Sequence, residues 1–101
     1  MDGDQGFYYS LLETFLQSAR TDIDSIKEAL EHGAFDKLRD KAHSLKGSSR
    51  NIGADTIGEI CQELETLANT HTREGAGELM ERLATEFARV EQEIGREMGA
   101  K

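Results

Sequence analysis

Residues 41–50 read Lys41-Ala42-His43-Ser44-Leu45-Lys46-Gly47-Ser48-Ser49-Arg50, and they place one histidine in the middle of a predicted helix. If residues 35–52 are helical, successive side chains rotate by about 100° around the axis. A stripe of small and apolar side chains then faces a core, and it consists of Phe35, Leu38, Ala42, Leu45, Ser49 and Ile52. His43 lies away from the middle of that stripe, so the pattern predicts a histidine that faces solvent.

His43 has basic or very small neighbours on its own side of this helix. These neighbours are Arg39, Lys46, Gly47 and Arg50, and residues three, four or seven apart share a helix face. An exposed imidazole among cations, beside a residue without a side chain, favours a site where an anion meets a histidine. The plain alternative is a solvated helix face that carries a histidine by chance. These residues alone leave both interpretations open.

The acidic net charge argues against one class of partner, nucleic acid. The chain has 101 residues, enough for one domain, and its net charge is −8, with 20 acidic and 12 basic residues. General nucleic-acid binding needs a basic surface, so we expect no nucleic-acid partner. Five of the basic residues nevertheless gather between residues 37 and 50, which is consistent with local recognition of an anion.

Cysteine content and hydropathy predict a soluble, cytoplasmic protein. Cys61 is the only cysteine, which excludes an intrachain disulfide and indicates a reducing compartment. We find no secretory signal and no apolar run near the roughly 20 residues that a membrane span needs. A monomer is the default expectation. The sequence also allows a module cut from a longer, membrane-bound chain.

Helical periodicity runs through almost the whole chain, which contains no proline. We predict helices over about 7–31, 35–51, 54–69 and 73–98, with a later start for the last because Gly75 and Gly77 weaken its first turns. Residues 1–6 are expected to be a disordered or short N-terminal segment. Residues 7–101 are then predicted to form an all-α, antiparallel up-down-up-down four-helix bundle.

The apolar stripes predict which helix faces meet in the bundle. The stripe of the first helix consists of Phe7, Leu11, Phe15, Ala19, Ile23, Ile26 and Leu30, and that of the last consists of Ala76, Leu79, Leu83, Phe87, Val90, Ile94 and Met98. Cys61 belongs to the stripe of the third helix, so we expect it to pack in the core.

Several kinds of active site lack the residues they need. There is no pair of Glu-x-x-His motifs for two iron ions, no Cys/His spacing for zinc and no glycine-rich phosphate loop. We therefore predict no metal site. The chemistry that fits the residues is nucleophilic attack on phosphorus by His43, with Gly47 leaving room and Lys46, Arg50 and Arg39 offering charge to phosphoryl oxygens.

A longer pattern surrounds the histidine. Ala42-His43-Ser44-Leu45-Lys46-Gly47-Ser48-Ser49 is followed by Ile52-Gly53-Ala54 and then by Cys61-x-x-Leu64-Glu65. These residues and gaps resemble the histidine-containing phosphotransfer (HPt) domain family, whose pattern is approximately A-H-x-L-K-G-[SA]-[SA]-x-x-x-G-A and then C-x-x-L-E. A weaker likeness extends from about Phe7 to Ile94 and so covers nearly the whole chain.

The resemblance implies a four-helix bundle that carries phosphoryl groups without an ATP site or catalysis of its own. His43 would be the phosphoacceptor, Lys46 the phosphate-stabilising residue and Gly47 the residue that gives a partner clearance. Glu65 would accept a hydrogen bond from the imidazole and orient it. Gln62, Arg39 and Arg50 are weaker candidates, as contacts at the rim of the site. Ser44 has the character of a variable position.

The resemblance also implies the partners. The phosphoryl group would pass between His43 and the aspartate of a response-regulator receiver domain in a two-component phosphorelay, and a hybrid sensor histidine kinase is a further candidate partner. The chain would need no cofactor, because Mg²⁺ is expected on the receiver. The alternative is a helical scaffold that binds a receiver or a kinase and is never phosphorylated.

Overall fold

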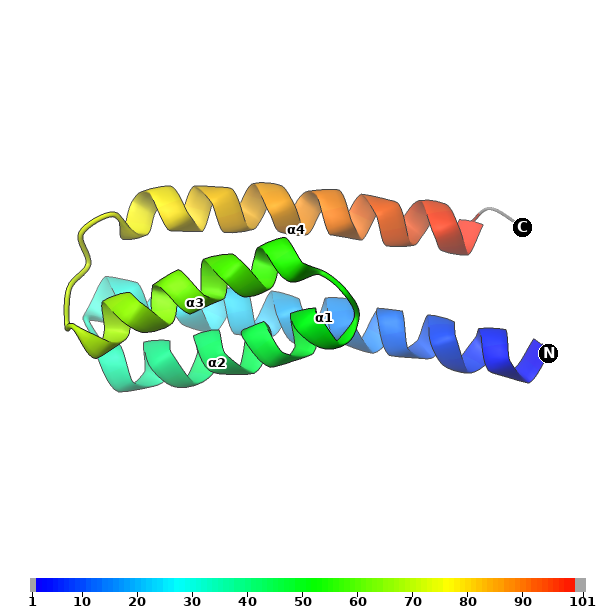
Figure 1. Cartoon of the computed structure of the whole chain (residues 1–101), viewed down its shortest axis with the longest axis horizontal. Helices are drawn as coiled ribbons and strands as arrows, with labels where there is room; N and C mark the ends of the chain where they lie inside the picture. The colour runs from blue at the N-terminus through cyan, green and yellow to red at the C-terminus, as the bar shows by residue number, and fades with distance from the viewer. Residues whose placement is uncertain (1, 100–101) are drawn as a thin grey trace.

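Four α-helices joined by short turns make up the computed structural model of the chain, which describes residues 2–99, with side chains from residue 6 onward. The helices are α1 (Asp2–His32), α2 (Phe35–Asn51), α3 (Asp55–Asn69) and α4 (Ala76–Gly99). Consecutive helices run in opposite directions in an elongated bundle of 48 × 20 × 19 Å (Figure 1). This arrangement confirms the predicted all-α up-down-up-down bundle.

The start of the first helix differs from the sequence prediction, whereas that of the last helix agrees with it. α1 begins at Asp2 and not at Phe7, so residues 2–6 continue the helix instead of forming a separate segment. Adding a turn to an existing helix is cheap because the nucleus is already formed. α4 begins at Ala76, which agrees with the expectation that this helix starts later than residue 73. Gly75 has φ +81°, a left-handed conformation that ends the preceding turn and does not continue into a helix.

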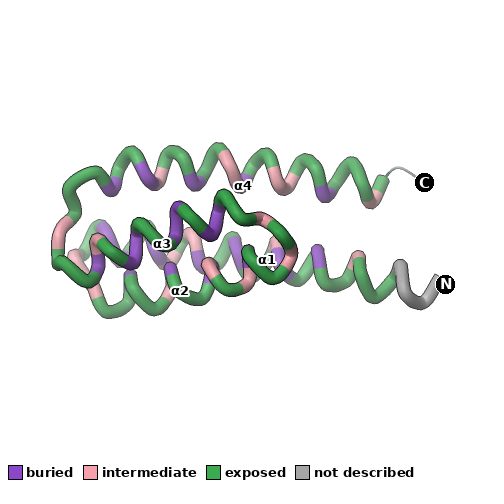
Figure 2. Tube along the Cα trace, viewed as in Figure 1, coloured by how far each residue is buried: buried purple, intermediate pink, exposed green. Residues whose placement is uncertain are grey.

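The core lies where the four apolar stripes meet (Figure 2). The α2 and α4 stripes face inward as predicted, although Phe35, Ile52, Val90 and Met98 are only partly buried. Part of the α1 prediction is wrong: Phe7 and Leu11 are 67% and 46% exposed, whereas Leu12 is buried.

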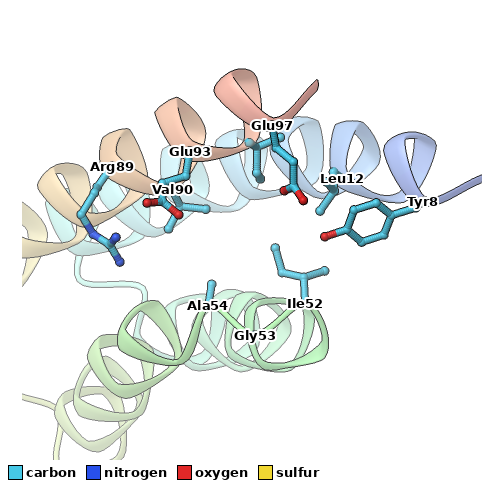
Figure 3. Close-up of a pocket in the computed structure, with 10 residues that line it drawn as sticks. Tyr8, Leu12, Ile52, Gly53, Ala54, Arg89, Val90, Glu93 and Glu97 are labelled. Atoms are coloured by element: carbon cyan, nitrogen blue, oxygen red, sulfur yellow. The ribbon is translucent and has the colours of Figure 1, made fainter. Parts of the chain in front are cut away.

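The exposure of Phe7 and Leu11 follows from the unequal lengths of the helices. α1 and α4 run past the turn between α2 and α3, so the N-terminal part of α1 has fewer neighbours to cover it (Figure 1). At this open end, a hollow of about 180 Å³ separates α1, the α2–α3 turn and α4 (Figure 3). Leu12 and Ile94 line this hollow from α1 and α4.

Polar contacts outside the core also fix the helices relative to one another. Arg73, in the turn before α4, donates from Nη1 to the carbonyl of Leu30 at 2.8 Å, which satisfies an acceptor at the end of α1. Arg20 of α1 pairs with Glu91 of α4 and lies 5.9 Å from the centre of the Phe87 ring. None of the four helices, over the residues described, is long and apolar enough to cross a membrane.

Candidate functional site

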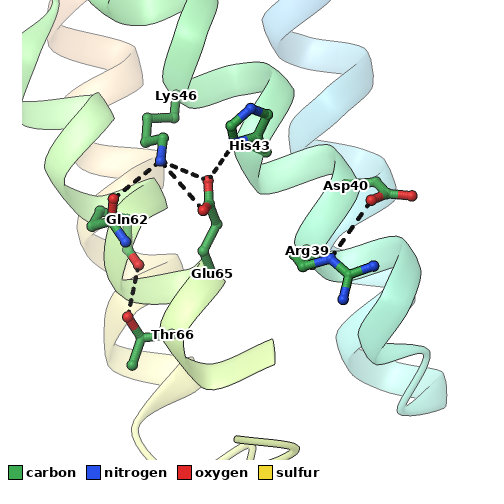
Figure 4. A network of polar contacts seen from close by, with 7 residues as sticks. All are labelled: Arg39, Asp40, His43, Lys46, Gln62, Glu65 and Thr66. Carbon is green, nitrogen blue, oxygen red and sulfur yellow. Dashed lines mark hydrogen bonds and ion pairs between the residues drawn. The ribbon is translucent and has the colours of Figure 1, made fainter. Parts of the chain in front are cut away.

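His43 stands on the outer face of α2, beside the seam with α3. Its side chain is 72% exposed, and its Nδ1 lies 3.1 Å from Oε2 of Glu65, whose side chain is only 11% exposed (Figure 4). Leu45 and Leu64 are fully buried in the core. The helix periodicity that buries them leaves His43 and Glu65 at the edge of the same seam.

This contact determines which ring nitrogen of His43 is free for chemistry. A carboxylate can only accept hydrogen bonds, so the interaction requires that Nδ1 carries a proton. In the neutral imidazole, the lone pair then resides on Nε2. Because Nδ1 faces Glu65 and the ring is largely exposed, Nε2 faces away from the protein (Figure 4). The arrangement presents a nucleophilic nitrogen with a fixed tautomer.

Lys46, one turn after His43, is directed toward α3. Its Nζ lies 3.0 Å from Oε2 and 3.3 Å from Oε1 of Glu65, and it donates to Oε1 of Gln62 at 3.0 Å. The Lys46 side chain is only 15% exposed. Glu65 therefore contacts His43 and Lys46 through the same carboxylate. The structure brings His43, Lys46, Gln62 and Glu65 into one network.

Gly47 is exposed and helical, and a Cβ placed there would meet no atom within 4 Å. A glycine inside a helix is about 1 kcal/mol less favourable than alanine. Packing within this chain does not explain that cost, because the space above Gly47 is open. The absence of a side chain therefore has consequences only for something that approaches from outside.

The two arginines predicted at the rim are not in contact with His43. Arg39 turns back along its own helix, with nitrogens 3.8 Å from Asp36 and 3.8 Å from Asp40 (Figure 4). Arg50 lies over the α2–α3 seam, where its side chain covers the backbone of Gly58. A Cβ on Gly58 would lie 2.9 Å from Nε of Arg50, so a side chain there would displace the arginine.

One polar contact next to the site was missed by sequence reasoning. Ser44 Oγ donates to Oδ2 of Asp22 at 3.2 Å, and Asp22 is buried, with 7% exposure. Ser44 therefore links α2 to α1 beside His43 and is more than a variable position. The available signal was an acid on the α1 stripe, since Asp22 lies three and four residues from Ala19 and Ile26.

A groove of about 370 Å³ runs between α1 and α2 on the C-terminal side of His43. Its lining is mainly apolar and uncharged, formed by Tyr8, Leu11, Leu12, Thr14, Phe15, Ser18, Ser48, Asn51 and Ile52. Asn51 and Gly47 follow His43 at steps of four residues, so they continue its face of α2 toward the groove. The exposed nitrogen and the groove thus belong to one side of the molecule.

Two further features of the described residues bear on other kinds of site, namely possible metal ligands and the one cysteine. Among the residues that the structure describes, no group of three or more His, Cys, Asp or Glu side chains could hold a metal ion. Cys61 is fully buried, as predicted. Burial, and secondarily the charges of Glu65 and Asp22, raise the pKa of its thiol to about 12, which keeps it protonated and unreactive at neutral pH.

The chain was compared with known proteins and structures. A family model described as the Hpt domain matches residues 10–93. Multistep phosphorelay regulator 1 of Schizosaccharomyces pombe is 28% identical over 78 residues, which cover 77% of this chain and 26% of that protein. Histidine-containing phosphotransfer protein 4 of Arabidopsis thaliana is 32% identical over 82 residues, which cover 79% and 64%. The chain thus spans less than two thirds of these relatives.

One solved structure matches this chain over a larger share of its own length than these relatives do. The crystal structure of histidine-containing phosphotransfer protein B (HptB) from Pseudomonas aeruginosa PAO1 matches with a TM-score of 0.91 and 34% sequence identity. The match covers 96% of this chain and 84% of that chain.

Proposed function

The chain belongs to the Hpt domain family, and we propose that it carries phosphoryl groups in a multistep phosphorelay, with His43 as the residue that accepts and donates them. The observation that supports this assignment most directly is the contact between His43 Nδ1 and Glu65 Oε2. It fixes the tautomer of an imidazole that is otherwise open to solvent, as in-line attack on another protein's phosphoryl group requires.

The transfer step follows from this geometry. Nε2 of His43 attacks the phosphorus of an aspartyl phosphate on a receiver domain, an N–P bond forms, and the P–O bond to the aspartate breaks. The aspartate carboxylate leaves with the electron pair of that bond. The imidazole gains positive charge as the N–P bond forms, and the Glu65 carboxylate, which keeps its hydrogen bond to Nδ1–H, stabilises that charge.

Lys46 and Gly47 serve the same step in different ways. Lys46 Nζ and His43 Nδ1 both contact Oε2 of Glu65, so the ammonium stands beside the imidazole and can turn toward a phosphoryl oxygen on His43. Gly47 leaves the space beside the imidazole open, so that a partner's aspartate can come into line with Nε2. The chain acts as a carrier and contributes no ATP site, and the Mg²⁺ that supports transfer is held by the receiver.

The partner is a receiver domain of a response regulator or of a hybrid sensor histidine kinase. The largely apolar groove between α1 and α2 continues the face of His43 and supplies a surface for a partner's apolar side chains. Tyr8 and Leu11, both 46% exposed, extend this surface onto the open end of α1.

The test uses a receiver domain phosphorylated with labelled phosphate. We expect acid-labile, base-stable label on the wild-type chain and none on His43→Gln. His32→Gln is a matched control, because His32 is also exposed and helical but bonds to the carbonyl of Glu28. It should accept label like the wild type.

Two results would contradict the proposal. Label that persists in His43→Gln would show that another residue is the acceptor. A wild-type chain that stays unlabelled with every receiver in a panel, while still binding one of them, would favour the scaffold alternative.

A further inference from the structure

We propose that Gln62 is a positioning residue that holds Lys46 away from His43 in the unphosphorylated protein and thereby limits the lifetime of the phosphohistidine. This inference rests on the proposed function, since it concerns the same imidazole. It assigns a role to a residue that does not contact the reacting atoms.

The first argument concerns the contacts that hold the Lys46 ammonium. A lysine ammonium has three N–H donors. Lys46 Nζ donates hydrogen bonds to Oε1 of Gln62 at 3.0 Å and to Oε1 of Glu65 at 3.3 Å, and it forms an ion pair with Oε2 of Glu65 at 3.0 Å. The side chain is 15% exposed, so little of it faces solvent. In this state both hydrogen bonds of the ammonium go to acceptors on α3.

The second argument concerns which contact yields when a phosphoryl group arrives. A phosphoryl group on Nε2 attracts the ammonium toward His43, and this movement weakens the contacts that Lys46 makes with α3. Glu65 is nearly buried and charged, and the bond that its carboxylate accepts from a cation is stronger than the bond that a neutral amide oxygen accepts. Gln62 is exposed and uncharged. The Gln62 contact is therefore the one that competes most evenly with the phosphoryl oxygens.

The third argument is the position of Gln62 in the fold. Gln62 and Glu65 lie three residues apart on α3, so they present two acceptors to Lys46 along one face (Figure 4). Gln62 draws the ammonium along the seam, whereas His43 lies on the other side of Glu65 (Figure 4). Removing its oxygen leaves Lys46 tethered only to the carboxylate that also contacts the imidazole.

The experiment loads the chain chemically, without a partner. Potassium phosphoramidate transfers its phosphoryl group to imidazole nitrogen, with an N–P bond formed to the histidine, the N–P bond of the reagent broken and ammonia released. After removal of the reagent, the decay of phosphate on His43 is followed by peptide mass spectrometry, which separates it from phosphate on His32 and His71. Because no receiver is present, the result is independent of whether a relay partner has been identified.

We expect opposite effects from two substitutions of Gln62. Gln62→Leu removes the acceptor and should lengthen the phosphohistidine half-life roughly two- to tenfold, the range set by one exposed hydrogen bond. Gln62→Glu adds a carboxylate that holds Lys46 more strongly and should shorten the half-life. Gln92→Leu, the same change at an exposed position of α4, should leave it unchanged.

A double-mutant comparison separates positioning from a general effect on the helix. In a Lys46→Met background, Gln62→Leu should no longer change the half-life, because the residue that it releases is gone. The His43 Nδ1–H resonance in the unphosphorylated chain should be the same in Gln62→Leu and in the wild type, which checks that the orienting contact is intact. A shorter or unaltered half-life in Gln62→Leu, or an equal effect with and without Lys46, would overturn the inference.

Discussion

Gly47 lowers the stability of this chain, whereas the space that it leaves open benefits an approaching partner. Its Cβ position is open, so alanine should fit without displacing any neighbour. Alanine also has the higher helix propensity. The structure therefore allows the requirements of folding and of partner access to be measured separately at one position.

Gly47→Ala should stabilise the isolated chain by about 0.5–1 kcal/mol and slow phosphoryl transfer from a receiver. The added methyl group lies beside the face that a receiver must approach. Chemical denaturation measures the first effect and single-turnover transfer the second. Gly77→Ala, also helical and open, provides the control: it should raise stability by a similar amount and leave transfer unchanged. A Gly47→Ala variant that transfers at the wild-type rate would refute the clearance role.

Because of Cys61, the free energy of unfolding should fall as the pH rises above about 9. Its folded-state pKa is about 12, above the ordinary value of 9.0, so between these values the unfolded thiol ionises and the folded one does not. The contribution of Cys61 is fully present below about pH 9 and is lost as the pH rises toward 12. The free energy of unfolding of the wild type, relative to Cys61→Ala, should fall by up to about 1.4 kcal/mol per pH unit in that window.

Urea unfolding of both chains at pH 8, 9 and 10 measures this difference, because other titrating groups are common to the two proteins and cancel. A difference that stays constant from pH 8 to 10 would mean that the folded thiol ionises normally.

At the residue scale, the sequence predicted which residues form the candidate site better than it predicted the contacts between them. His43, Glu65 and Lys46 could be named because their types and spacing match a family pattern. The pairing of Lys46 with Gln62 could not, since it depends on side-chain conformations across two helices. Arg39 shares the helix face of His43, yet nearby acids attract it away from that residue. Spacing alone does not register this competition.

At the scale of the elements, the four helices were predictable from their periodicity. Where each helix ends depends on the conformation of the adjoining turn and on the helices packed beside it. Gly33 and Gly53 follow the ends of α1 and α2, and both adopt positive φ, which ends a helix. Burial at the open end of α1 depends on how far α2 and α3 extend, a property of the packed bundle. This is why Leu12, and not Leu11, belongs to the core.

The turn before α4 offers a matched test of these backbone requirements. Gly75→Ala should lower the free energy of unfolding by about 1–2 kcal/mol, because φ of +81° is strained for any residue with a Cβ. Gly77→Ala, two residues later and inside the helix, should raise it by about 0.5–1 kcal/mol. Thermal or urea denaturation of the two variants measures the contrast. Equal effects from the two variants would mean that the conformation of Gly75 does not determine where α4 starts.

At the scale of the whole molecule, the bundle is unevenly packed. α2 and α3 form the most extensively packed pair, and the contact between α1 and α4 is the least extensive of the four helix pairs. The network of His43, Lys46, Gln62 and Glu65 lies across the first pair. Arg20, through Glu91 and Phe87, bridges the second pair.

Arg20→Met should loosen α4 against α1 without disturbing the site. An exposed ion pair and a cation–π contact are worth about 1 kcal/mol each or less, so we expect a loss of about 0.5–1.5 kcal/mol. Amide hydrogen exchange should accelerate in α4 but not in the middle of α3. Arg82→Met, which breaks an exposed pair with Glu63 at 3.5 Å, is the control and should have the smaller effect. Uniform acceleration in all helices would argue against a separate α1–α4 seam.

The start of α1 and the end of α4 lie at the same end of the bundle, which sets the reach of any tether (Figure 1). Ser44, next to His43, lies opposite Asp22, so the site is about twenty residues and hence about 30 Å along α1 from Asp2. A receiver fused to that end needs a linker of at least about nine extended residues. A flexible linker matches the span at about thirty residues, where the effective concentration of receiver at His43 should be highest. A shorter linker would keep the fused receiver away from His43. Linker length alone would then determine whether His43 exchanges phosphoryl groups with the fused receiver or with free partners.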